Sequence, residues 1–164
     1  MKRLIREKAH RLPRTAYQGE VTASMTMVIK GRGRTFTDAW VVTAFVDLLR
    51  EVAERRSCLV VVYCFMPDHL HLVLHGESSK SDLWRTTAEF KQRSGYWLYR
   101  HSPEISWQKD FHDHIIRQGD DLAAHVRYIL ENPCRRGLVS QWEEYPWKGS
   151  IGCRLEDILS GLPL

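Results

Sequence analysis

The stretch Pro67-Asp68-His69-Leu70-His71 places two histidines on either side of one apolar residue. In a β-strand, side chains two residues apart point to the same face, about 7 Å apart along the backbone. His69 and His71 would therefore project together, while Leu70 points into the core. Two imidazoles that converge from one strand can bind a divalent metal. The pair indicates a candidate metal site, although the bare pattern also occurs incidentally.

The sequence around this pair predicts a β-hairpin. Residues 58–65 are an apolar run rich in β-branched side chains, residues 66–68 have turn character, and residues 69–75 alternate in polarity. Such alternation is typical of a strand with one core face and one functional face. The expected core face holds Leu70, Leu72 and Leu74, and the other face holds His69, His71, Val73 and His75. We expect His75 to be a surface or secondary contact, because it lies about 13 Å along the strand from His71.

A second informative segment, residues 120–133, has the pattern of a helix that opens with acidic residues and ends at a proline. At about 100° per residue it has two stripes. The first is apolar, with Leu122, Val126, Ile129 and Leu130; the second holds Asp121, His125, Tyr128 and Asn132. A core tyrosine would lie with the leucines, but Tyr128 shares its face with polar groups. A solvated polar face is the alternative interpretation of this second stripe.

The remaining elements complete a βαββαβ order. We expect a strand over residues 18–29 with core methionines Met25 and Met27, a helix over 38–55 capped by Thr37, a helix over 79–100 and a strand over 107–117. This order predicts an α+β, ferredoxin-like split-βαβ fold with a central antiparallel sheet. The two long helices would cover one face of the sheet, and the helix that carries Tyr128 would cover the other.

Two segments resemble a known family. The run Tyr-Cys-Phe-Met-Pro-Asp-His-Leu-His-Leu-Val-Leu-His at residues 63–75 resembles the HUH motif (histidine, hydrophobic, histidine) of single-tyrosine transposases. The run Tyr-Ile-Leu-Glu-Asn-Pro-Cys-Arg-Arg-Gly-Leu-Val at 128–139 resembles the nucleophile helix of the REP-associated tyrosine transposases. Segments 107–114 and 145–147 are similar to further parts of that family. The resemblance extends from about residue 14 to residue 152, and Cys134 replaces an expected small aliphatic residue.

The resemblance implies a function and a set of roles. His69 and His71 would be metal ligands, Asn132 a third polar ligand, and Tyr128 the nucleophile. The implied enzyme is a metal-dependent transposase or endonuclease that uses Mg²⁺ or Mn²⁺. It would cleave and join single-stranded DNA through a 5′-phosphotyrosine intermediate. The family recognises imperfect palindromic repeats that fold as hairpins next to a short single-stranded guide sequence.

Three alternatives stay open at this stage. The protein could bind DNA hairpins without catalysis, or it could be a metal-dependent hydrolase that uses water, with Tyr128 as a spectator. A covalent protein–DNA adduct that survives denaturation would separate these alternatives from the transposase. The third alternative concerns the metal pair, since His112-Asp113-His114 has the same spacing. Its central Asp113 would face the core side, where a carboxylate needs a hydrogen-bond partner.

Composition sets the general class. The chain has 164 residues, of which 43% are hydrophobic and 27% charged, as in an ordinary soluble domain. No apolar run approaches the ~20 residues of a membrane span, and the N-terminus has no signal-peptide pattern. The four cysteines lack Cys-x-x-Cys spacing, which favours free thiols in a reducing cytoplasm. We expect a basic arm over residues 1–14, a catalytic domain over 15–152 and a C-terminal tail over 153–164.

The net charge of +4 is unevenly distributed. Clusters of basic residues suit contact with phosphates, and glycines accompany one of them. The predicted DNA-contacting residues are Lys2, Arg3, Arg6, Lys8, Arg11, Arg14, Arg32, Arg34, Arg135 and Arg136. Trp142, Tyr145 and Trp147 could stack on bases, but we expect them to pack a C-terminal segment onto the body. The expected partner is hairpin DNA without a membrane; a homodimer, and a tyrosine helix that serves a partner subunit, are left open.

Overall fold

The computed structural model of the protein describes residues 12–164. An antiparallel sheet of five strands, in the order β4-β1-β3-β2-β5, forms its centre. The strands are β1 (Thr22–Val28), β2 (Cys58–Met66), β3 (His69–Gly76), β4 (His112–Ile116) and β5 (Lys148–Ile151). The helices are α2 (Ala39–Arg55), α3 (Leu83–His101), α4 (Leu122–Leu130), α5 (Asn132–Arg135) and α6 (Leu155–Leu159). Short 3₁₀ turns are η1 (Arg14–Tyr17), η2 (Lys30–Arg32) and η3 (Trp142–Glu144).

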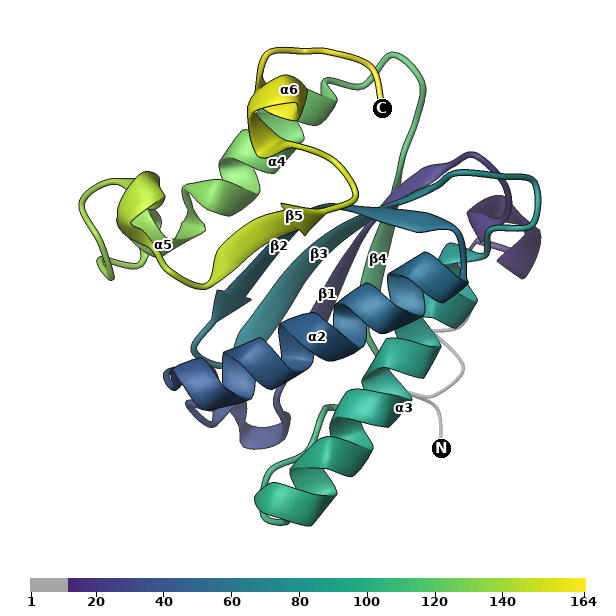
Figure 1. Ribbon diagram of the computed structural model, residues 1–164. Helices are drawn as coiled ribbons and strands as arrows, with labels where there is room; N and C mark the ends of the chain where they lie inside the picture. Colours follow the sequence, from purple (N-terminus) through teal and green to yellow (C-terminus); the bar gives the residue numbers. More distant parts are fainter. Residues whose placement is uncertain (1–11) are drawn as a thin grey trace, which may run out of the picture.

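The predicted fold class is confirmed. The first four strands have the order of the split-βαβ pattern, with β3 inserted between β1 and β2. Figure 1 shows α2 and α3 side by side on one face of the sheet, with α4 and α6 on the opposite face. The helix that carries Tyr128 is therefore on the face away from the two long helices, as the sequence predicted.

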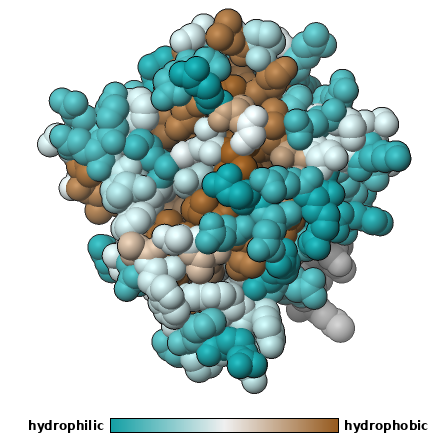
Figure 2. Space-filling view, in the orientation of Figure 1, coloured by the Kyte–Doolittle hydropathy of each residue, from teal (hydrophilic) through white to brown (hydrophobic). Residues whose placement is uncertain are grey.

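Two hydrophobic cores lie on opposite faces of the sheet. The first core, beneath α2 and α3, receives Leu70, Leu72 and Leu74 from β3 together with Met25 and Met27 from β1. The second core, beneath α4 and α6, receives Val73 from the same strand. In Figure 2, hydrophilic residues cover much of the outer surface, while hydrophobic residues gather toward the region between α2 and the α4–α6 layer. The alternation in residues 69–75 therefore separates two cores.

Several predicted boundaries were wrong, each for a local reason. Asp38 caps α2 in place of Thr37, because its carboxylate accepts a hydrogen bond from the Trp40 amide at 2.7 Å. Helix α3 begins at residue 83, after Asp82, whose carboxylate accepts from the Arg85 amide. Pro133 does not end the helical path. It occupies the first turn of α5, where its missing N–H leaves no bond unmade.

The C-terminal region adds to the body of the domain. Strand β5 pairs with β2 at the edge of the sheet, and the sequence had not indicated it. Tyr145 is buried and its hydroxyl donates to the Phe65 carbonyl at 2.5 Å, which confirms that this aromatic segment packs. Residues 153–164 were expected as a tail, yet they include α6, whose Ile158 is buried in the second core.

Two further observations concern the described part of the chain. Within residues 12–164, no helix has the length and apolar character needed to cross a membrane. All four cysteines are free, and Cys58 and Cys64 are buried. Burial raises the pKa of the Cys64 thiol to about 12, so this side chain is an uncharged core group at neutral pH.

Candidate active site

The two histidines of the hairpin meet on the α4 face of the sheet. Strand β3 pairs His71 with Thr26 of β1 and Cys64 of β2, so the pair lies on inner strands. The Nε2 atoms of His69 and His71 are 3.1 Å apart. His69 is buried, with 6% of its surface exposed. Two imidazole nitrogens thus converge on one point, as the spacing predicted.

A carboxylate that the sequence analysis had not singled out orients His69. Asp68 Oδ1 lies 2.6 Å from His69 Nδ1, so a proton on Nδ1 is donated to the carboxylate and Nε2 carries a free lone pair. This is the arrangement that usually fixes a metal-ligating histidine. The signal in the sequence was a carboxylate in the turn directly before the first histidine.

Arg32 holds Asp68 from its other side. Its Nε is 2.9 Å from Asp68 Oδ2. The segment that carries Arg32 is attached to the hairpin turn by backbone bonds, including Thr35 N to Pro67 O at 2.7 Å and Ile29 N to Asp68 O at 2.9 Å. Arg32 adopts φ 59°, in the left-handed region that non-glycine residues rarely occupy. Arg32, which the sequence predicted to contact DNA, therefore contacts the Asp68 carboxylate in this structure.

Asn132 completes the cluster from the other side. It is the first residue of α5, and its Nδ2 lies 2.7 Å from His71 Nε2. The two ends of an amide are interchangeable by a half-turn of the side chain, which presents Oδ1 at the same place. The structure therefore brings together His69, His71 and Asn132, which lie 61 residues apart or more across the two motifs.

These donors fit a small divalent ion. Neighbouring ligands of an octahedral ion with bonds of about 2.1 Å lie about 3 Å apart, which is close to the 3.1 Å between the two imidazole nitrogens. Within residues 12–164 no group of three His, Cys, Asp or Glu side chains is placed to hold a metal. Asn132, whose side-chain amide lies against His71 Nε2, could offer its Oδ1 as a further donor.

The surroundings keep both imidazoles neutral. Burial, with smaller contributions from the nearby His69, Arg135 and Arg136, lowers the pKa of His71 to about 4. Burial also lowers the pKa of His69, although Asp68 opposes that shift. Neutral imidazole is the form that binds a metal, so both side chains are in the binding form at neutral pH.

Tyr128 lies on α4, one helical turn before Asn132. Its side chain is 64% exposed. The Arg135 guanidinium lies over its ring, 3.8 Å from the centroid, and Arg135 Nη2 donates to the Tyr128 carbonyl at 2.7 Å. A single chain therefore supplies both the histidine cluster and an accessible tyrosine close to it. The exposed ring lies beside the Arg135 cation.

The uncovered half of the same sheet face is polar. We call it the polar floor; it consists of Thr22, Ser24 and Thr26 of β1 and His112 and His114 of β4. Thr26 Oγ1 is 3.3 Å from His71 Nδ1, and Thr22 Oγ1 is 2.8 Å from His75 Nδ1. The sequence signal was the alternation of small polar residues with Ala23, Met25 and Met27 in β1.

The second His-x-His pair belongs to this floor. His112 and His114 are exposed, and the His114 ring is stacked with that of His125 at a centroid distance of 6.3 Å. Asp113 points to the opposite face and accepts a hydrogen bond from the Tyr17 hydroxyl. This bond supplies the partner that a carboxylate on the core side requires.

The predicted DNA-contacting residues are dispersed. Arg135 and Arg136 lie near the histidines, and Arg34 is exposed on the segment that follows Arg32. Arg14 packs over Trp84 of α3, with its guanidinium 4.6 Å from the ring centroid. The other five predicted contacts lie outside the described residues; they are Lys2, Arg3, Arg6, Lys8 and Arg11.

The sequence of this chain is similar to those of known transposases. The sequence model of the family described as "Transposase IS200 like" matches residues 18–132. A REP-associated tyrosine transposase of Haemophilus influenzae is 24% identical over 133 residues, which is 74% of this chain and 75% of that protein. The REP-associated tyrosine transposase of Escherichia coli strain K12 is 28% identical over 102 residues, or 59% of this chain and 57% of that protein.

Two solved structures share the fold. A REP-associated tyrosine transposase bound to a REP hairpin superimposes with a TM-score of 0.72 at 22% identity, covering 94% of this chain and 87% of that one. A transposase from Deinococcus radiodurans gives a TM-score of 0.52 at 19% identity, covering 74% and 96%. The match to the family model spans both the hairpin with the two histidines and the helix that carries Tyr128.

Proposed function

The chain belongs to the family of IS200-like transposases, and we propose that it cleaves and rejoins DNA strands through a covalent bond to Tyr128. The substrate would be single-stranded DNA next to a hairpin formed by an imperfect palindrome. A relative with the same fold is bound to a REP hairpin, which supports a hairpin substrate for this chain.

The proposed reaction uses the Tyr128 phenol oxygen as the nucleophile. This oxygen forms a bond to the scissile phosphorus while the bond from phosphorus to the 3′ oxygen breaks. The 3′ oxygen takes up a proton and leaves as a hydroxyl, and the 5′ end of the other fragment stays attached as a phosphotyrosine. A second 3′-hydroxyl can attack this phosphotyrosine and join strands without ATP, because the covalent bond preserves one phosphodiester-like linkage.

The other residues of the site bind and orient. His69, His71 and Asn132 would hold Mg²⁺ or Mn²⁺, which when bound polarises a non-bridging oxygen of the phosphate. Asp68 fixes the tautomer of His69, so that Nε2 faces the site. Arg135 and Arg136 place positive charge where the DNA phosphates would approach. The polar floor offers hydroxyls and imidazoles, and no apolar surface, to a strand lying on the sheet.

One observation carries this proposal: a single chain brings His69, His71 and Asn132 into contact, with the exposed Tyr128 one turn away. The test uses hairpin oligonucleotides built from palindromic repeats of the source genome, labelled at either end and incubated with Mn²⁺. We expect wild-type protein to give a 3′-hydroxyl fragment and a protein-linked fragment that survives denaturation. Tyr128→Phe should bind the hairpin and give neither product.

A matched control is Tyr99→Phe, which changes another exposed tyrosine on the opposite face of the sheet. It should react like the wild type. Cleavage by Tyr128→Phe at the wild-type rate, with free 5′-phosphate ends, would instead indicate a water-dependent hydrolase. Hairpin binding without any cleavage by the wild type would indicate a protein that binds only.

A further inference from the structure

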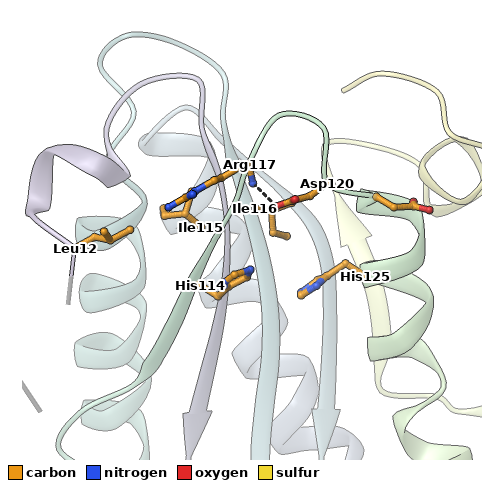
Figure 3. A pocket seen from close by; sticks show the side chains of 8 residues that line it. Leu12, His114, Ile115, Ile116, Arg117, Asp120 and His125 are labelled. Atoms are coloured by element: carbon orange, nitrogen blue, oxygen red, sulfur yellow. Dashed lines mark hydrogen bonds between the residues drawn. The ribbon is translucent and has the colours of Figure 1, made fainter. Parts of the chain in front are cut away.

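A pocket of about 520 Å³ lies beside the polar floor, between β4 and the beginning of α4 (Figure 3). It is separate from the His69–His71–Asn132 cluster, and none of those residues lines it. Its lining residues are Leu12, His114, Ile115, Ile116, Arg117, Asp120, Asp121 and His125. The pocket therefore combines an apolar wall with imidazole, guanidinium and carboxylate groups.

Two imidazole rings give the pocket its shape. Figure 3 shows His114 and His125 projecting toward each other from β4 and α4. Their planes are 23° from parallel and their centroids are 6.3 Å apart, near the upper limit for aromatic rings in contact. Nearly parallel rings of this kind offer stacking faces to a flat aromatic ligand.

One nitrogen in the pocket lacks a partner. His125 Nε2 is shielded from solvent and forms no hydrogen bond with the part of the chain that the structure describes. Shielded polar atoms of this kind are uncommon in folded proteins, and a missing ligand is one explanation. A flat ligand with a polar edge would supply both a stacking partner and a hydrogen bond.

The charges in the pocket disfavour a phosphate. The pocket is lined by two carboxylates, Asp120 and Asp121, and by one guanidinium, Arg117. Two backbone amides at the pocket are already bonded: Ala124 N donates to Asp121 at 2.9 Å, and Arg117 N donates to Asp120 at 2.8 Å. Carboxylates instead accept hydrogen bonds from amino groups, which adenine, cytosine and guanine carry.

The pocket is within reach of a strand at the proposed cleavage site. His114 pairs with Ser24, which pairs with Val73, two residues from His71 on the same face. From strand spacings, His114 is about 12 Å from His71 at the backbone. This distance corresponds to about three or four stacked nucleotides.

We propose that this pocket binds one unpaired nucleobase of the DNA strand that passes over the polar floor. The base stacks on the imidazole of His114, and its amino edge faces Asp120 and His125 Nε2. The inference rests on the proposed DNA substrate and deepens it, because it adds a subsite that selects among bases. Adenine and cytosine should bind better than thymine, whose O4 would face a carboxylate.

The test measures binding of labelled octanucleotides dA8, dC8 and dT8 to the Tyr128→Phe protein without metal, by fluorescence anisotropy. We expect dA8 and dC8 to bind several-fold more tightly than dT8. Changing both His114 and His125 to Ala should weaken dA8 binding about tenfold and remove the preference. Changing both to Phe should restore most of the affinity for stacking, and His101→Ala, on α3, should leave binding unchanged.

A second readout places the base directly. The imidazole Cε1 proton signal of His114, assigned with the His114→Ala variant, should shift upfield when dA8 is added, because a stacked base shields it. Equal octanucleotide affinities for the Tyr128→Phe protein with and without the His114 and His125 to Ala changes would overturn the subsite. The same shifts with inorganic phosphate, or with Zn²⁺ alone, would make it an anion or metal site and would also overturn it.

The two proposals fail separately. Absence of a covalent adduct on hairpin DNA contradicts the role of Tyr128 and does not affect octanucleotide binding. Unchanged octanucleotide binding in the His114 and His125 variants contradicts the subsite and does not affect the result of the adduct assay.

Discussion

At the residue scale, two contacts decide which nitrogen of His69 faces the site. Arg32 Nε lies 2.9 Å from Asp68 Oδ2, and Asp68 Oδ1 lies 2.6 Å from His69 Nδ1. The Asp68 carboxylate fixes the tautomer of His69. Without it, the Nδ1 proton of His69 has no acceptor at that place, and the other tautomer becomes accessible. Arg32 neutralises part of the carboxylate charge and fixes its orientation.

We predict that Asp68→Asn lowers Mn²⁺ affinity by about 10- to 100-fold, in line with other contacts that orient metal ligands. Isothermal titration calorimetry on the metal-free protein measures this directly. Asp47→Asn, on the exposed side of α2, is the matched control and should titrate like the wild type. Undiminished Mn²⁺ affinity in Asp68→Asn would show that His69 needs no such orientation.

His71 makes the stability of the metal-free protein depend on pH. Its pKa falls from 6.5 to about 4 on folding, because burial and neighbouring cations disfavour the imidazolium. Between those values the unfolded chain binds a proton that the folded chain does not, so the free energy of unfolding falls as the pH falls from about 6.5 to 4. The contribution of His71 is at most about 3 kcal/mol.

Urea unfolding at pH 7 and pH 4.5, in the presence of a chelator, tests this effect. His71→Gln, which stays neutral, should lose less stability between the two pH values than the wild type does. His101→Gln, at an exposed position on α3, should retain the wild-type difference. Identical pH dependence in wild type and His71→Gln would contradict the assignment.

At the element scale, β5 and the aromatic segment before it close the edge of the sheet. The hydroxyl of Tyr145, a residue of the second core, donates to the Phe65 carbonyl, and Phe65 N donates to the Trp147 carbonyl at 2.8 Å. Removal of the hydroxyl leaves a buried carbonyl oxygen without this donor, a change that costs about 1–3 kcal/mol. These bonds fasten the C-terminal segment to β2.

Tyr145→Phe should therefore lower the free energy of unfolding by about 1–2 kcal/mol, with the fold retained. Chemical denaturation measures the difference. Tyr99→Phe, which removes a hydroxyl from a side chain that is 68% exposed, should change stability by less than about 0.5 kcal/mol. Equal stability of the two variants would mean that the Tyr145 bond contributes nothing.

The elements that the sequence predicted are those with long, regular patterns. Residues 58–65 form a continuous apolar run and residues 69–75 alternate, so the two hairpin strands were placed within one residue of their observed bounds. Strand β5 was missed because Lys148-Gly-Ser-Ile has one buried residue in four and no alternation. Helix α5, which contains Pro133, was missed because a proline inside a helical pattern normally ends the helix. Here a second short helix begins at Asn132, one residue before the proline.

The candidate site was only partly readable from the sequence. The spacing of His69 and His71 predicted their common face, and Asn132 came from a resemblance. Asp68 was visible in the sequence next to His69 but was given no role. Thr26 and His114 could not be assigned, because their roles depend on strand register and on which half of the sheet face α4 leaves uncovered. Register between β1, β3 and β4 is a property of the fold and is not visible in any one segment.

At the scale of the whole molecule, the two faces of the sheet differ in which elements cover them and in how polar they are. Helices α2 and α3 lie on one face, and α4 and α6 lie on the other (Figure 1). The second face is divided between the second core and the polar floor. Arg135 and Arg136 border the second face, whereas Arg14 lies against α3. The basic residues at positions 2–11 lie outside the described residues, and we expect them to add contacts to DNA phosphates.

Deletion of residues 1–11 should weaken hairpin binding and leave the rate of cleavage within the bound complex unchanged. Each lost phosphate contact should make the plot of log affinity against log salt shallower by roughly 0.7 on single strands. Binding titrations at several salt concentrations, with single-turnover cleavage as the companion measurement, test this. An unchanged slope and affinity would mean that these five basic residues do not contact DNA.

The central claim is that Tyr128 becomes covalently attached to a 5′ end of DNA. After reaction with hairpin DNA and Mn²⁺, the adduct is digested with trypsin and nuclease and analysed by mass spectrometry. Trypsin cuts after Arg127 and Arg135, and residues 128–135 contain one tyrosine. The account predicts a phosphonucleotide on this peptide, attached to Tyr128 through the 5′ phosphate of the DNA. A phosphonucleotide on any other residue, or cleaved DNA with no modified peptide, would contradict it.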